Sequence, residues 1–217
     1  MKRRDFIKNS IIAGTALTLS VVAGASVISS NSDSDNRKES KMKILVLTGS
    51  PRKNGNSNIL VDNFIKGAEE NGHKVVRFDA AFKNVHPCMA CDRCGMSGEC
   101  VFKDDFGFVK ENIVDADMVV FATPMYYFGI SAQLKTIIDR FYSINGKIHT
   151  PKKSALFMTY ADTRAIEAEP IKKHYETLLN YLSWTNVGEI IAPGVWLAGS
   201  INQTKYPKTA YELGKNL

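Results

Sequence analysis

The chain has 217 residues, 44% of them hydrophobic, which is enough for one well-packed core and for one or at most two domains. Its formal net charge is +6, but half of this excess lies in the first eight residues, where four basic side chains outnumber one acidic side chain. The charge on the remainder is too small to indicate a nucleic-acid partner. All four cysteines fall between positions 88 and 100, which predicts a local site rather than disulfides distributed over a fold.

Residues 1–25 have the composition of an export signal. A basic head precedes residues 9–32, which carry no formal charge and include small side chains suited to a cleavage site. Arg3 and Arg4, followed by Phe6, resemble the twin-arginine signal, which implies export of a protein already folded, often around its cofactor. The alternative is an uncleaved membrane anchor, which the length permits but the many Gly, Ser and Thr residues disfavour.

A flexible spacer is expected next, over residues 26–41, which are polar, mixed in charge and poor in large apolar side chains. The folded domain is expected to occupy residues 42–217. It opens with residues 44–47, which are all apolar, as in a strand buried on both faces of a parallel sheet. The polar loop 49–57 follows, and from Ser57 onward apolar side chains recur at helical spacing.

This loop has the features of a phosphate site, because a loop that enters a helix presents backbone N–H groups and the positive helix end to an anion. Arg52 adds a guanidinium, and short polar side chains add further donors. Neither GxxxxGK[ST] nor GxGxxG is present. Gly49-Ser-Pro-Arg-x-x-Gly-Asn-Ser57 instead resembles the flavin-phosphate loop of the NAD(P)H-dependent FMN reductases. The resemblance implies FMN bound by Ser50, Arg52, Asn56 and Ser57. A turn that Ser57 caps without any ligand is the alternative.

The rest of the chain alternates between strand and helix patterns. We expect strands at 74–78, 117–122, 154–159 and 187–192, and helices from Asp104 or Asp105 to near 116, around 134–141, from Pro170 to 182 and over 209–216. Five apolar strands alternating with helices predict a doubly wound, five-stranded parallel α/β sandwich with helices on both faces. The flavodoxin-like strand order 2-1-3-4-5 brings the loops after the first and third strands together.

The loop after the third strand, residues 123–130, is the second part of the predicted ligand site. It combines a stiff proline and a permissive glycine with aromatic side chains that supply flat apolar surface. In the FMN reductase family the equivalent stretch contacts the isoalloxazine ring. The similarity implies the same contact for Pro124, Met125, Tyr126, Tyr127, Phe128 and Gly129. Aromatic side chains that only cover the end of the sheet are the alternative. After the fourth strand we expect Tyr160 and Asp162 as a third wall, although Asp162 fits a loop cap equally well.

The four cysteines have the spacing C-x2-C-x2-C-x5-C, at Cys88, Cys91, Cys94 and Cys100, in a loop of residues 86–105. Three thiolates at this spacing can converge on a compact metal centre, and the intervening glycines let the fourth turn back. The motif closely resembles the compact cysteine motif of the iron–sulfur flavoproteins, which implies a [4Fe–4S] cluster beside the flavin. Two disulfides, tetrahedral zinc, and a cysteine loop without any metal remain open.

These features together predict an exported FMN-dependent oxidoreductase in which a cluster passes electrons to or from FMN. An NAD(P)H-dependent FMN or quinone reductase with structural cysteines is one alternative, and an electron carrier without a substrate of its own is another. NAD(P)H is a candidate donor, although no nicotinamide fingerprint occurs. The expected partners are a redox protein or a small-molecule acceptor, and further copies of the chain. Membrane contact is expected only through the N-terminal segment. No arrangement for hydrolysis was found, and no catalytic residue is predicted.

Overall fold

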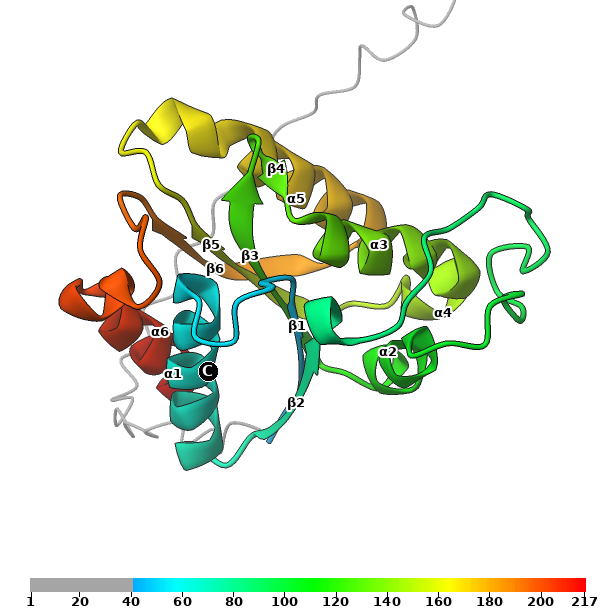
Figure 1. The fold of residues 1–217 in the computed structure, drawn as a ribbon. Coiled ribbons are helices and arrows are strands. Elements are labelled where there is room, and N and C mark those ends of the chain that lie inside the picture. The colour runs from blue at the N-terminus through cyan, green and yellow to red at the C-terminus, as the bar shows by residue number, and fades with distance from the viewer. Residues whose placement is uncertain (1–40) are drawn as a thin grey trace, which may run out of the picture. The chain divides into compact units, whose positions relative to one another are not determined.

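The computed structural model describes residues 41–217, so the signal expected at 1–25 and nearly all of the spacer expected at 26–41 lie outside the described residues. The strands are β1 (Lys43–Thr48), β2 (Lys74–Asp79), β3 (Met118–Tyr126), β4 (Gly129–Ile130), β5 (Lys153–Thr159) and β6 (Thr185–Ala192). The helices are α1 (Asn56–Glu70), α2 (Phe106–Val114), α3 (Ala132–Arg140), α4 (Asn145–Ile148), α5 (Glu169–Leu182) and α6 (Tyr206–Lys215) (Figure 1). Within this part of the chain, no helix is both long and apolar enough to span a membrane.

Five parallel strands form the centre of the domain, in the order β2-β1-β3-β5-β6. This order corresponds to the predicted flavodoxin-like order 2-1-3-4-5, and the fold prediction is confirmed. Strand β1 pairs on both sides, so that Leu45 lies opposite Val76 of β2 and Val119 of β3. The short strand β4 is an addition to the prediction, and it pairs antiparallel with the end of β3.

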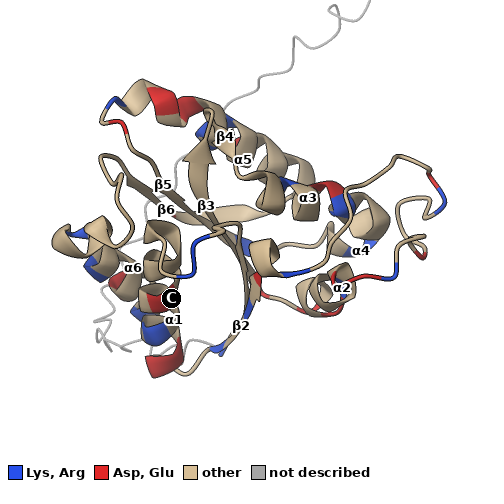
Figure 2. Ribbon diagram, in the orientation of Figure 1, with Lys and Arg blue, Asp and Glu red and all other residues tan. Residues whose placement is uncertain are grey.

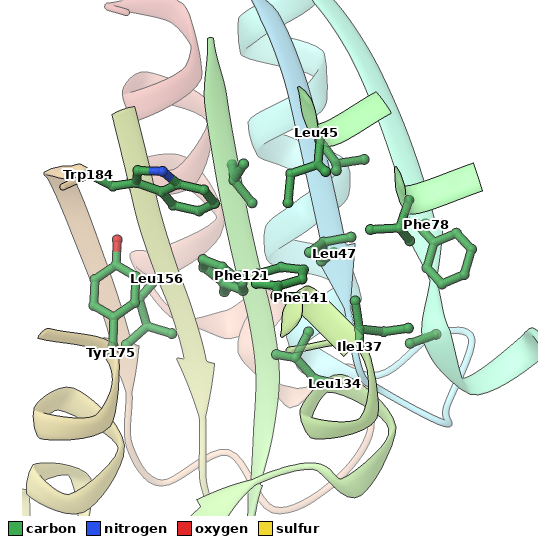
Figure 3. Packing of buried hydrophobic residues seen from close by; sticks show 14 of the residues in the cluster. Leu45, Leu47, Phe78, Phe121, Leu134, Ile137, Phe141, Leu156, Tyr175 and Trp184 are labelled. Carbon is green, nitrogen blue, oxygen red and sulfur yellow. The ribbon is translucent and has the colours of Figure 1, made fainter. Parts of the chain in front are cut away.

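The sheet separates two hydrophobic cores because successive side chains of each strand point to opposite faces. Leu45, Leu47 and Phe121 pack on one face with apolar side chains of α2, α3 and α5 (Figure 3). Ile44 and Val46 pack on the other face with side chains of α1 and α6. Burial on both faces explains why the parallel strands are almost continuously apolar in the sequence.

Several element boundaries differ from the prediction. β3 continues four residues beyond the expected end at 122, because its last residues pair with β4. α1 begins at Asn56 after the N-cap residue Gly55, so Ser57 lies inside the helix and is not its cap. α6 begins at Tyr206 instead of position 209, with a proline in its first turn. The expected proline in the first turn of α5 is confirmed.

Candidate functional site

A pocket of about 440 Å³ lies at the carboxyl edge of the parallel strands, where the loops after β1, β3, β5 and β6 meet. Its volume falls within the range of about 300–1,000 Å³ that is usual for small-molecule sites. The pocket is lined by Ser50, Arg52, Gly55, Asn56, Ser57, Pro124, Met125, Tyr126, Tyr127, Thr159, Tyr160, Ala161, Val195 and Trp196. Nine of the twelve residues predicted for the flavin are therefore brought together here. Phe128, Gly129 and Asp162 are not among the lining residues.

The start of α1 is open toward this pocket. Its N-cap, Gly55, provides no side chain, and the N–H groups of a first helical turn have no partner inside the helix. A side chain at position 55 would meet the Ser50 hydroxyl at 2.6 Å, so glycine keeps this approach clear. Arg52 is exposed in the same loop, where basic residues are coloured blue in Figure 2, and it has no ion-pair partner among residues 41–217. The combination is suited to an anion.

The side chain of Asn58 fixes the conformation of the loop between β1 and α1. This fully buried side chain donates from Nδ2 to the carbonyl oxygens of Arg52 at 2.9 Å and Lys53 at 3.2 Å. Its Oδ1 accepts a hydrogen bond of 2.6 Å from the Thr48 hydroxyl. The sequence did not single out Asn58, because a polar residue in the first turn of a helix does not by itself indicate a contact with the preceding loop.

The side chain of Asn56 connects the start of α1 to the segment after β6. Nδ2 donates to the carbonyl oxygens of Val195 and Leu197, each at 2.9 Å, and Oδ1 accepts from the N–H of Ile201 at 3.3 Å. The Ser57 hydroxyl is likewise engaged, at 2.8 Å from the Thr159 hydroxyl. Both residues line the predicted pocket, but their side chains bind the last residue of β5 and the segment after β6. Their backbone N–H groups are therefore what they offer an anion.

The hairpin of β3 and β4 forms the second wall. Tyr127 and Phe128 connect the two strands with φ angles of 44° and 62°, the left-handed conformation that both central residues of a type I′ turn require. Asn and Gly are the usual residues at such positions, and bulky residues there are strained. Tyr127 is 100% exposed and lines the pocket, whereas Phe128 is half-exposed and is not among the lining residues.

The third wall differs from the expectation. Tyr160 lines the pocket and is buried, which raises the pKa of its hydroxyl. Asp162 instead caps its own loop, accepting hydrogen bonds from the N–H groups of Thr163 and Arg164 at 2.5 Å and 3.0 Å. Trp196, 74% exposed after β6, was missed by the sequence reasoning. Its position just after the last parallel strand could have indicated it, since the carboxyl ends of all these strands lie at the edge of the sheet that carries the pocket.

The cysteines form a separate site. Cys88, Cys91, Cys94 and Cys100 are free thiols, and all four line one small cavity. Within the described part of the chain, no three side chains of His, Cys, Asp or Glu lie close enough together to hold one metal ion. The loop between Cys88 and Cys100 is tightly turned, with Ala90, Asp92 and Met96 at positive φ. The four thiols are thus neighbours around one cavity without converging on a single point.

Contacts from α3 and the segment after it fix the cysteine loop. The Tyr142 hydroxyl donates to the Asp92 carboxylate at 2.6 Å, and the N–H of Gly146 donates to the Met96 carbonyl oxygen at 3.1 Å. A side chain at position 146 would meet the Ser97 hydroxyl at 2.3 Å. The loop therefore rests directly on this helical segment.

The two sites lie apart in the molecule. No described residue lines both the pocket and the cysteine cavity. In Figure 1 the cysteine loop extends beyond α2 and α4, on the opposite side of the molecule from α1 and from the segment between β6 and α6. The loop starts at the carboxyl end of β2, as expected, but its cysteines line a cavity of their own, and a cluster beside the flavin stays a prediction.

The fold and the pocket define a flavodoxin-like α/β protein with a small-molecule site at the switch point of its sheet. The pattern of one family, NADPH-dependent FMN reductase, matches residues 42–194, and the chain belongs to this family. An iron–sulfur flavoprotein of Archaeoglobus fulgidus is 38% identical over 99 residues, which cover 46% of this chain and 45% of that protein. The chain spans about half the length of the iron–sulfur flavoproteins it matches.

Two further likenesses extend over more of the chain. A putative NAD(P)H-dependent FMN-containing oxidoreductase of Bacillus subtilis is 25% identical over 165 residues, covering 70% of this chain and 86% of that protein. The structure of an NAD(P)H:quinone oxidoreductase from Methanothermobacter marburgensis superimposes with a TM-score of 0.67 at 19% identity, covering 82% of this chain and 96% of that one. At this identity the likeness supports the fold alone.

Proposed function

We propose that the protein is an FMN-dependent oxidoreductase that receives electrons from NAD(P)H. The observation that carries the proposal is the pocket itself, in which a helix N-terminus without a side-chain cap and the exposed Arg52 lie beside an aromatic hairpin. The anion-binding part fits the phosphate of FMN, and the aromatic part fits its flat ring. Membership of the NADPH-dependent FMN reductase family supports both the cofactor and the donor.

Bound FMN supplies the electron chemistry, because it handles one or two electrons. The chain's own residues bind and orient it. The first turn of α1 and Arg52 hold the phosphate, while Pro124, Met125 and Tyr126 line the space for the ring. Asn56 keeps the segment with Trp196 closed against the pocket through its bonds to Val195 and Leu197. Tyr127 and Trp196 stay exposed at the mouth, where an acceptor arrives.

The cysteines, in this proposal, hold a [4Fe–4S] cluster that passes single electrons. Four free thiols around one cavity are a suitable set of donors. Zinc also takes four thiolates, so metal and sulfide analysis distinguishes it from a cluster. The matched stretches of iron–sulfur flavoproteins add support.

Two candidate partners follow from the separation of the sites. A redox protein that docks near the cysteines, or a small-molecule acceptor at the mouth of the pocket, would complete the electron path. The chain is further proposed to form a homo-oligomer, in which the cysteine loop of one copy approaches the flavin of another. A reductase with structural cysteines, or a carrier with no substrate of its own, is the competing function, and iron analysis distinguishes the first from the cluster hypothesis.

Protein purified without oxygen tests the function. We expect denaturation to release FMN and not FAD, and we expect about four irons and four sulfides per chain, as in a [4Fe–4S] centre. Addition of NAD(P)H should then bleach the flavin absorbance. FAD or no flavin would contradict the cofactor assignment. Zinc, or FMN without any metal, would leave an FMN or quinone reductase with structural cysteines.

Export by the twin-arginine route is also proposed, and it rests on the sequence of residues 1–25 alone. Replacing Arg3 and Arg4 together by Lys keeps the charge but removes the paired guanidinium groups. We expect the double variant to stay in the cytoplasm with its cofactors, while the parent chain is recovered outside it. Equal export of both proteins would refute this route, and retention of the parent in the membrane fraction would support the uncleaved anchor.

A further inference from the structure

Arg140, the last residue of α3, is the largest fully buried side chain of the described residues. Its guanidinium lies over the rings of Phe102 and Phe106, at 5.3 Å and 4.8 Å from their centroids, and the side chain is 2% exposed. Burial of a charged group is costly unless the group is paired, so an arginine in this position needs a specific reason.

One reason is mechanical, because Arg140 joins the two ends of the cysteine loop. Its Nη1 donates to the carbonyl oxygen of His86 and to the Asp104 carboxylate, each at 2.8 Å, and Nη2 donates to the same carboxylate at 3.3 Å. Asp104 also accepts from the N–H of His86 at 2.9 Å. One buried ion pair therefore closes the loop at residues 86 and 104, on either side of all four cysteines.

Of the two members of the ion pair, only Arg140 lines the cavity of the cysteines. Arg140 lines the cysteine cavity together with Cys88, Cys91, Cys94 and Cys100, whereas Asp104 lines only an adjoining cleft, which Arg140 and Cys100 line as well. The positive member of the pair is thus the one at the wall of the cavity. In addition, the buried Nε of Arg140 has no hydrogen-bond partner, and an unmade bond of this kind is unfavourable.

We propose that Arg140 is a positioning residue of the metal centre that also sets its redox potential, through its fixed positive charge beside the cysteine cavity and a buried Nε–H donor without a partner. The inference rests on the proposed cluster. A cluster with four thiolate ligands gains one negative charge on reduction, and a buried cation nearby favours the reduced form. Hydrogen bonds to cluster sulfurs act in the same direction. Arg140 therefore raises the potential, and Asp104 partly offsets it.

Two variants separate the electrostatic role from a merely structural one, because each breaks the same buried pair. Arg140→Met removes the positive charge at similar length, and Asp104→Asn removes the negative charge. Both should weaken the closure of the loop, so that a chelator removes iron several-fold faster from each. Their cluster midpoint potentials, measured by anaerobic titration with spectroscopic detection, should move in opposite directions: downward for Arg140→Met and upward for Asp104→Asn.

Arg140→Lys serves as the control, since it keeps the charge but loses the two-pronged contact with Asp104. It should release iron faster while its potential stays much closer to that of the parent than the potential of Arg140→Met. Shifts of the same sign in Arg140→Met and Asp104→Asn, or no shift in either, would overturn the inference while leaving the cluster in place. If Arg140→Met does not fold, the absence of an upward shift in Asp104→Asn overturns it. A parent protein without iron refutes the proposed cluster, and with it this inference, and leaves the reductase with structural cysteines.

Discussion

Arg52 is exposed and has no ion-pair partner among residues 41–217, whereas Asn56, one turn further along the chain, is buried and hydrogen-bonded to three backbone groups. The sequence motif presents the two as equivalent polar donors, since spacing alone does not distinguish a side chain that faces a ligand from one that holds a neighbouring loop. The segment bound by Asn56 lies about 140 positions later, and no local pattern indicates such a contact.

Arg52→Ala should therefore weaken flavin binding without unfolding the protein. Loss of one charge-assisted hydrogen bond costs about 1.5–3 kcal/mol, which corresponds to roughly 10- to 150-fold in the dissociation constant. Fluorescence titration of the flavin-free protein with FMN measures this change. Arg164→Ala is the matched control, because Arg164 is exposed but pairs with Asp162 and Glu167 and does not line the pocket. Equal losses in both variants would argue against a phosphate contact by Arg52.

Asp104 gives the protein an acid-sensitive contact. Burial raises the pKa of its carboxyl, but hydrogen bonds from Arg140 and from the N–H groups of His86 and Phe106 outweigh this and bring the pKa below its ordinary value. A lowered folded-state pKa contributes stability above the unfolded value of about 3.9, and this is lost as the pH falls through the folded value. The free energy of unfolding, measured with urea between pH 7 and pH 2.5, should fall less steeply below pH 4 in Asp104→Asn. Equal slopes would contradict this role.

At the scale of elements, the prediction succeeded where burial on both faces of the sheet leaves an unbroken apolar run, as in β1 and β5. It missed β4 because Tyr127 and Phe128, which connect β3 to β4, are not the Asn and Gly residues that usually indicate a type I′ turn. It also misjudged Ser57, since a serine near a helix start is the usual cap, whereas here glycine takes that place.

We expect Tyr127 and Phe128 to lower the stability of the hairpin, while the Tyr127 ring contributes to ligand binding. Tyr127→Asn combined with Phe128→Gly supplies the residues that a type I′ turn prefers, and relief of two left-handed bulky residues should raise the free energy of unfolding by about 1–2 kcal/mol. Removal of the Tyr127 ring should at the same time weaken flavin or acceptor binding by about 0.5–1.5 kcal/mol. Urea unfolding and flavin titration of the same samples measure the two effects.

Ser183→Gly provides the control for the hairpin variant. Ser183 follows α5 with a φ of 60°, so glycine should stabilise the fold there as well, but this residue does not line the pocket. Its flavin affinity should therefore equal that of the parent. If the hairpin variant binds the flavin and the acceptor as tightly as Ser183→Gly does, the exposed aromatic side chains have no part in the site.

On the scale of the whole molecule, the topology correctly gathers the loops after β1, β3 and β5 into one pocket, since all of them start at the carboxyl edge of the sheet. The same rule says less about the cysteines. It states where the loop after β2 begins but not where its residues 83–105 lead. These residues are held by Arg140, the last residue of α3, and by Tyr142 and Gly146 in the segment after it. A long loop follows its anchoring contacts, which come from a distant part of the sequence.

Because no described residue lines both sites, their cofactors should be lost independently. Replacing any one of the four cysteines by Ser should remove or destabilise the cluster, since its ligation needs all four thiolates, while FMN stays bound at the parent stoichiometry. Arg52→Ala should do the reverse, lowering the flavin content and leaving iron unchanged. Flavin absorbance and iron analysis of the same anaerobic preparations give both quantities. Loss of flavin in a cysteine variant that still unfolds cooperatively would show that the two sites depend on each other, and separate losses would confirm that one chain carries two independent redox centres.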